Sequence, residues 1–248
     1  MSDVITLSDS TRAAIKKLFD INQSLKIAHD QTTTREDDGG NEVTMTVIRS
    51  KSGNRTMMAR IEVPEVFPRD VHIYDLREFN SAINIVSDPE FDFSDDKCVV
   101  IRSKDNKQQL RYVETSPDLI DSYIDKDLPE CADVEFVVTE QQFKSVLTAA
   151  RTMKLNQVGF ISDGETLNIS AFDKNNGDNR DINNFSVELT DHDREFRMFY
   201  KLDTHNISVL ESEGDLLFKI DGKRKVSQIE TQSGKTYWIA FDSKSEWN

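Results

Sequence analysis

The sequence contains two long segments that resemble each other at a constant spacing of 126 residues, 74–113 and 200–239. Upstream of each lies a second related pair of segments, 7–27 and 138–158. Pattern and spacing carry the relation more than identity does. The identical pairs are Tyr74 and Tyr200, Leu76 and Leu202, Asn80 and Asn206, and Lys97 and Lys223. A duplicated half-chain predicts two similar domains, and 248 residues are enough for each to bury its own core.

The predicted elements recur in the same order in both halves. Helices are predicted from capping residues and apolar stripes at 8–22, 75–86, from 139 onward and at 203–210. The capping residues are Ser8 or Ser10, Asp75, and Thr139 in a capping box with Gln142. Strands are predicted at 42–50, 55–63, 90–95, 97–103, 108–114, 134–138, 157–162, 166–172, 184–189, 195–202, 215–220, 224–230 and 236–241. The predicted fold class is α+β, with two similar domains of antiparallel sheet that carry two helices each.

The segment 114–133 separates the two halves. It is acidic, contains Pro117 and Pro129, and shows neither helical nor strand periodicity. We therefore predict an interdomain connector there, between a first domain over 1–113 and a second over 134–248.

No group of residues in the sequence converges on catalysis or metal binding. The four histidines are scattered, none has metal-ligand spacing to a cysteine, and no Gly-rich phosphate loop or nucleophile elbow occurs. The acidic stretches 88–96 and 173–181 do not fit the calcium loop, which needs Gly at its sixth position and Glu at its twelfth. We predict that the protein is not an enzyme and has no catalytic residues, cofactor or metal.

Cysteine use and hydropathy indicate a compartment. Only Cys98 and Cys131 are present, which favours a reducing environment without a structural disulfide. The N-terminus lacks the apolar core of a signal peptide, and no later run approaches the length of a membrane span. The sequence therefore predicts a soluble cytoplasmic protein with no membrane partner.

Basic residues are concentrated on two predicted helices, although the formal net charge is −14. Segments 11–19 and 143–155 each contain three basic residues and no acidic one. With 45 acidic residues in the chain, about four would be expected by chance in these 22 positions. At 100° per residue, Lys144 and Arg151 fall on one narrow arc opposite the apolar face. The alternative interpretation is that both helices simply turn charge to the solvent.

A duplicated α+β half, an acidic exterior, two basic helices and a connector together resemble the DNA sliding clamps. The closest likeness is to the DNA polymerase processivity clamps of T-even-type bacteriophages. It extends along the whole chain, through `LSDSTRAAIKKLFDIN`, `VHIYDLREF`, `VTEQQFKSVLTAAR` and `YWIAFDS`. The chain departs from that family in the loops 30–42 and 173–184, which look extended, in its acidic connector, and in a second minor helix without Lys or Arg.

The resemblance implies the DNA-clamp fold assembled as a homotrimeric ring around duplex DNA. The residues that would then face the DNA are Arg12, Lys16, Lys17, Arg77, Lys144, Arg151 and Lys154. The subunit interface would pair strands that contain Leu110, Tyr112, Phe185 and Val187, and a pocket for partner peptides would involve Tyr123, Ile124, Leu128 and Pro129.

The resemblance also implies a set of partners. They are double-stranded DNA bound without sequence preference, further copies of the chain, the phage DNA polymerase, an ATP-dependent clamp loader and factors of late transcription. The expected location is the cytoplasm of the infected bacterial host. The alternatives that remain are a two-domain β-rich interaction or virion protein that does not encircle DNA, an open-groove single-strand binder and, last, an enzyme.

Overall fold

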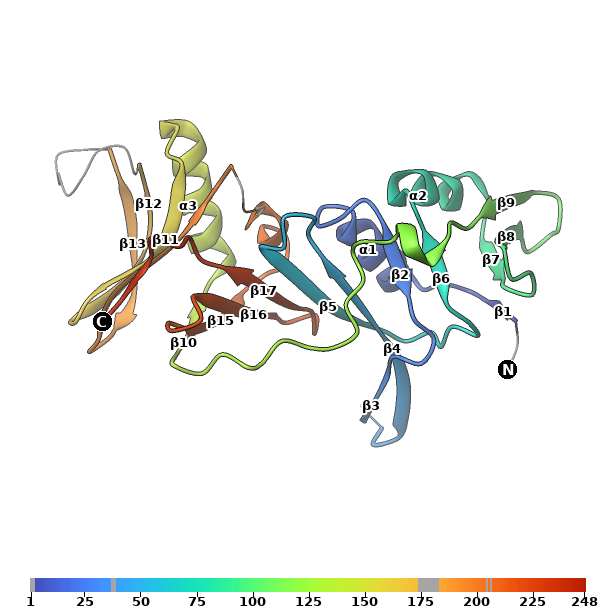
Figure 1. The fold of residues 1–248 in the computed structure, drawn as a ribbon, viewed down its shortest axis with the longest axis horizontal. Coiled ribbons are helices and arrows are strands. Elements are labelled where there is room, and N and C mark those ends of the chain that lie inside the picture. Colours follow the sequence, from blue (N-terminus) through green and yellow to red (C-terminus); the bar gives the residue numbers. More distant parts are fainter. Residues whose placement is uncertain (1–2, 37–38, 174–182, 204, 206) are drawn as a thin grey trace. The chain divides into compact units, whose positions relative to one another are not determined.

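The computed structural model describes residues 3–36, 39–173, 183–203, 205 and 207–248. The chain forms two compact units, Met1–Asp127 and Leu128–Asn248, whose strands and helices are labelled in Figure 1. The predicted connector 114–133 contributes to both units. Its first part contains a single turn of 3-10 helix, η1 (Pro117–Leu119).

The first unit combines two helices with three antiparallel sheets. The helices are α1 (Asp9–Leu18) and α2 (Leu76–Ile85). One sheet has the order β1-β7-β8-β9, formed by Val4–Ile5, Pro89–Asp92, Cys98–Ser103 and Gln109–Val113. Another has the order β5-β4-β3, formed by Met57–Val63, Glu42–Lys51 and Thr32–Glu36. A short pair joins β2 (Leu25–Ile27) to β6 (Val71–Ile73).

Local side-chain chemistry sets both helices of the first unit. The Ser8 hydroxyl accepts a hydrogen bond from the backbone N–H of Thr11, and the Asp75 carboxylate caps α2 in the same way. The apolar face of α2 is buried, and Phe79 meets Tyr112 of β9 edge to face with ring centroids 4.9 Å apart. This aromatic contact fixes α2 against the sheet, because such pairs add about 0.5–1.5 kcal/mol to the burial of their area.

Where the structure describes it, the second unit has one long helix and two sheets. The helix is α3 (Glu140–Met153). One sheet has the order β10-β15-β16-β17, formed by Val134–Val138, Leu216–Asp221, Val226–Thr231 and Thr236–Ala240. The other has the order β13-β12-β11-β14-β18, formed by Phe185–Asp191, Thr166–Phe172, Gln157–Asp163, Glu195–Lys201 and Glu246–Trp247. A 3-10 helix, η3 (Ile207–Leu210), precedes β15.

An aromatic cluster forms the core of the second unit beneath α3. Phe160 lies edge to face with Phe136 and with Phe218, at 4.8 Å in each case, and Phe143 of α3 approaches Phe218 at 6.4 Å. All four rings are buried. The capping box at Thr139 and Gln142 therefore starts α3 at the point where its apolar face first covers this cluster.

The fold class predicted from the sequence is confirmed, and the repeat spacing of 126 residues recurs in the positions of two observed strands. Shifting β9 by 126 residues gives 235–239, one residue from the observed β17 (Thr236–Ala240). The other predicted strands are also observed, with ends displaced by a few residues.

Three sequence predictions need correction. The minor helix expected over 203–210 is a 3-10 helix at Ile207–Leu210, so the described residues of the second unit form one α-helix. The region 30–42 is not simply a loop, because Thr32–Glu36 form β3 and pair with β4. The short strands β1, β2, β6 and β18 were not predicted. Most of the predicted loop 173–184 lies outside the described residues.

Candidate nucleic-acid interface

Helix α1 carries its basic residues away from the core of the first unit. Its buried residues are Thr11, Ala14, Ile15 and Leu18. Lys16 is exposed, while Arg12 and Lys17 are half-buried at the flanks of the solvent face. Arg12 pairs with the carboxylate of Asp9 one turn earlier. The first unit thus presents three cations and one carboxylate on this helix.

Arg77 joins the same surface from α2. Its guanidinium lies over the ring of Phe19, at the end of α1, with 5.1 Å between the guanidinium carbon and the ring centroid. The two helices are in contact, so the structure brings Arg77 beside the basic residues of α1. A stacked guanidinium keeps its charge available to solvent, because the ring contacts only one face of the planar group.

Helix α3 carries the corresponding residues of the second unit. Lys144 and Arg151 are both exposed, but each has an acidic partner. The Lys144 ammonium lies 2.6 Å from the carboxylate of Glu140, and Arg151 pairs with Glu211, whose hydrogen bond raises the pKa of the arginine. Lys154 is the C-cap residue in a left-handed conformation, beyond the arc that Lys144 and Arg151 share.

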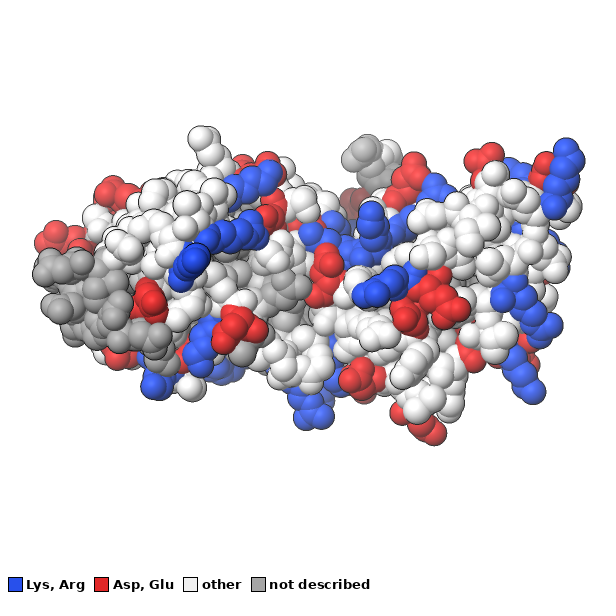
Figure 2. All heavy atoms as spheres, turned by 90° about the horizontal axis from the view of Figure 1, so that it is seen from above, with Lys and Arg blue, Asp and Glu red and all other residues white. Residues whose placement is uncertain are grey.

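The segments 11–19 and 143–155 contain no acid, but each helix begins upstream of its segment and includes a carboxylate in its first turn, Asp9 in α1 and Glu140 in α3. Carboxylates are favoured in the first turn because they interact with the positive end of the helix dipole. Each helix with its C-cap therefore carries three cations and one carboxylate, a weaker positive excess than expected. Figure 2 shows basic and acidic side chains interspersed on the surface seen from above.

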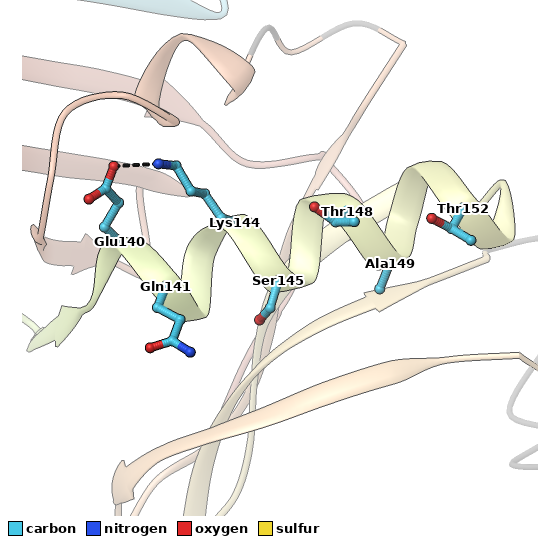
Figure 3. Close-up of a pocket in the computed structure, with 7 residues that line it drawn as sticks. All are labelled: Glu140, Gln141, Lys144, Ser145, Thr148, Ala149 and Thr152. Carbon is cyan, nitrogen blue, oxygen red and sulfur yellow. Dashed lines mark hydrogen bonds and ion pairs between the residues drawn. The ribbon is translucent and has the colours of Figure 1, made fainter.

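A shallow hollow of about 620 Å³ follows the exposed face of α3. Figure 3 shows its lining, which comes entirely from this helix: Glu140, Gln141, Lys144, Ser145, Thr148, Ala149 and Thr152. Most of these side chains are short, so a large ligand can approach the helix backbone closely. Hydroxyl, amide and ammonium groups along such a face suit contact with phosphates, which carries no sequence information.

The strands predicted to form the subunit interface are both at sheet edges. β9 ends one sheet of the first unit and β13 ends one sheet of the second, so each offers unpaired backbone groups. The side chains of Leu110, Phe185 and Val187 are half-buried. Tyr112 is 7% exposed and packs on Phe79 within its own unit, so only its backbone is free to contact a neighbour.

The four residues predicted to line a partner pocket divide between the two units. Tyr123 and Ile124 are half-buried in the first unit, and Leu128 and Pro129 are exposed in the second. Tyr123 is held in place, because its carbonyl accepts a hydrogen bond from Lys51 Nζ at 3.0 Å and Lys26 lies 4.6 Å above its ring.

Several residues of the candidate site were missed in the sequence. Glu140 could have been found there, since an acid directly after the capping threonine belongs to the helix. Glu211 could not, because it is 60 residues from Arg151 along the chain.

Of the helices formed by the described residues, none is long and apolar enough to cross a membrane.

Known proteins with similar sequences were compared with this chain. No protein-family model matches the chain. It is 26% identical over 167 residues to a protein named sliding clamp from Vibrio phage KVP40. The matched region covers 64% of this chain and 73% of the relative.

Two solved structures are similar over nearly the whole chain. One is A. fulgidus PCNA, described as bound to the C-terminal region of FEN-1, with a TM-score of 0.65, 15% identity and coverage of 98% of both chains. The other is the proliferating cellular nuclear antigen of Entamoeba histolytica, with a TM-score of 0.66, 8% identity and coverage of 98% of this chain and 100% of that one. The chain therefore has the DNA-clamp fold.

Proposed function

We propose that this chain, which has the DNA-clamp fold and resembles a phage sliding clamp in sequence, is itself a sliding clamp. It encircles duplex DNA as a homotrimeric ring and tethers the replicative DNA polymerase, so that synthesis becomes processive. The observation that carries the proposal is the exposed excess of cations on α1 and α3, in two similar units of a chain with a net charge of −14.

Weak attraction is sufficient for such a protein. A protein that grips DNA through many phosphate contacts loses affinity steeply with salt, and each contact must break before it moves. A closed ring is retained by topology instead, so a few partly neutralised cations centre the duplex without holding it in one place. Lys16 and Lys154, with the paired Arg12, Lys144 and Arg151, fit this role.

Ring closure requires a head-to-tail contact whose rotation returns to the starting subunit. The edge strands β9 and β13 are suited to it, because β9 of one copy can pair with β13 of the next and satisfy backbone groups on both. Leu110, Phe185 and Val187 would then become buried at the new contact.

The clamp itself performs no chemistry in this proposal. A polymerase bound to the ring rebinds its template at high effective concentration after each local release. Partner peptides would dock beside the connector near Tyr123, Ile124, Leu128 and Pro129. An ATP-dependent loader would open the ring, factors of late transcription would use the same platform, and the site of action would be the cytoplasm of an infected bacterium.

Retention on DNA of two topologies tests the central claim. The ring is loaded onto a nicked circular plasmid, and the bound fraction is measured before and after a single restriction cut. A sliding clamp stays on the circle and is lost from the linear DNA, and blocking the ends with bulky protein restores retention. Equal retention on both forms would contradict encirclement.

Sedimentation separates the proposal from its main rival. A trimer at micromolar concentration supports the ring. A monomer over the same range would favour a two-domain interaction or virion protein with ordinary solvent-facing helices.

A further inference from the structure

One group of side chains in the first unit brings together ligands suited to a metal ion. His29 and Asp30 follow β2, and Asp70 precedes β6. These strands are antiparallel partners with Ile27 opposite Val71, so the residues just beyond them meet at one end of the pair. One possible ligand atom from each of the three side chains lies within 4.8 Å of the other two.

Asp70 is held in position by its neighbours. Its Oδ1 accepts a hydrogen bond from the backbone N–H of His29 at 3.0 Å and lies 2.7 Å from the Nδ1 atom of the same residue. Its Oδ2 lies 2.7 Å from Nζ of Lys26. These contacts fix the orientation of the Asp70 carboxylate at the end of the β2-β6 pair.

The other two ligands can adjust. His29 and Asp30 are exposed, and the Asp30 carboxylate forms no hydrogen bond or ion pair with any part of the chain that the structure describes. A tetrahedral zinc ion with bonds of about 2.0–2.1 Å needs ligand atoms about 3.4 Å apart. The present spacing is up to 4.8 Å, and His29 and Asp30 are exposed, so both side chains have room to rotate toward the tetrahedral spacing.

We propose that His29, Asp30 and Asp70 bind one divalent transition-metal ion, with Zn²⁺ the best match. One imidazole nitrogen and two carboxylate oxygens suit zinc, whereas Mg²⁺ prefers a shell of oxygen atoms. Three protein ligands leave a fourth position for water. None of these three residues belongs to α1 or α3, and the site does not depend on the proposed DNA function.

Lys26 limits the affinity of this site. Its ammonium occupies the second oxygen of Asp70 and repels an incoming cation. It also lies over the ring of Tyr123, so its position is fixed from two sides. Removing the ammonium while keeping an unbranched apolar chain, as in Lys26→Met, should therefore strengthen metal binding. Adventitious binding of metal ions to an acidic surface should respond to the loss of Lys26 no more than to the loss of any other lysine.

Titration calorimetry of the full chain with ZnCl₂ tests the proposal. We expect one equivalent to bind, His29→Ala and Asp30→Asn each to weaken binding about tenfold or more, and Lys26→Met to strengthen it severalfold. His192→Ala, an exchange of a histidine in the other unit, should leave binding unchanged. In NMR spectra of the imidazole protons, addition of ZnCl₂ should shift the signals of His29 and leave those of the other three histidines in place.

Three results would overturn the site. Absence of a heat of binding at millimolar Zn²⁺ is one, and unchanged binding in His29→Ala is another. Competition by equimolar Mg²⁺ would also contradict it, because the imidazole nitrogen would then contribute nothing to selectivity.

Discussion

Replacement of Glu140 and Glu211 by glutamine should strengthen binding to duplex DNA rather than weaken it. In the structure these two carboxylates neutralise Lys144 and Arg151, the two cations within α3. Glutamine keeps the size of each side chain and removes its charge. The double variant therefore releases two cations without adding one.

The magnitude follows from the exposure of the pairs. All four side chains are between 28% and 56% exposed, so loss of each pair changes the free energy of unfolding by at most about 1 kcal/mol. On DNA, each released cation that neutralises a phosphate steepens the dependence of log K on log salt by about 0.9. Two released cations per subunit steepen the slope of log K against log salt by up to about 1.8. For each subunit in contact with DNA, the double variant should then lose about ten times more affinity than the wild type between 50 and 200 mM salt.

Fluorescence anisotropy with a short linear duplex measures this slope directly, because the ring can thread onto free ends. The matched control is Glu165→Gln, which removes one charge from the exposed turn between β11 and β12. If the double variant keeps the wild-type affinity and slope, α3 does not face the DNA. If Glu165→Gln produces the same gain per charge, the effect is one of net charge and not of position.

Four further results are expected. The double charge reversal Lys144→Glu with Arg151→Glu should leave the sedimentation of the assembly unchanged and shorten its retention on circular DNA, and equal retention would remove these residues from the inner surface. A Cβ at Gly222 would overlap the ring of Trp247, so Gly222→Ala should displace β18 and shift the tryptophan fluorescence, whereas Gly53→Ala, which meets nothing within 4 Å, should not. Phe218→Ala should lower the free energy of unfolding in urea by about 3–5 kcal/mol, because its ring packs against Phe136 and Phe160, and a loss below 1 kcal/mol would contradict that core. The hydrogen bonds from Arg49 hold the pKa of Asp127 below its usual range, so the carboxylate stabilises the fold above the unfolded-state value of 3.8 and stops doing so as the pH falls through the folded-state value; Asp127→Asn should therefore be less stable than the wild type at pH 7 but not in strong acid.

The features that could be predicted from the sequence are those encoded within about ten residues. The capping box at Thr139 and the cap at Asp75 fixed the starts of α3 and α2, since each side chain satisfies a backbone N–H two or three positions away. The three strands β15, β16 and β17 were also predicted, although their pairing with one another was not. The repeat then connected these local signals into a fold class, because two copies of the same order of elements imply two similar domains.

The features that were missed depend on contacts between distant residues. β2 and β6 are three residues long and separated by more than forty, so neither has a period that can be recognised alone. β3 consists of polar residues, Thr32–Glu36, and is a strand only because β4 supplies its partner. Tyr112 alternates correctly along β9, but the sequence does not tell which side of that strand α2 covers.

The charge on the helices shows the same division between local and distant information. Glu140 and Asp9 pair with cations three or four residues away, and such spacing is visible in any helical projection. The partner of Arg151 comes from the turn after η3, so only folding brings it near. If α3 does face DNA, that distant carboxylate weakens the attraction between the last turn of the helix and the phosphates. Lys154 at the C-cap is then the one cation of α3 without an ion-pair partner among the described residues. The position of acids around the cations, more than the number of cations, then sets how freely the duplex moves past α3.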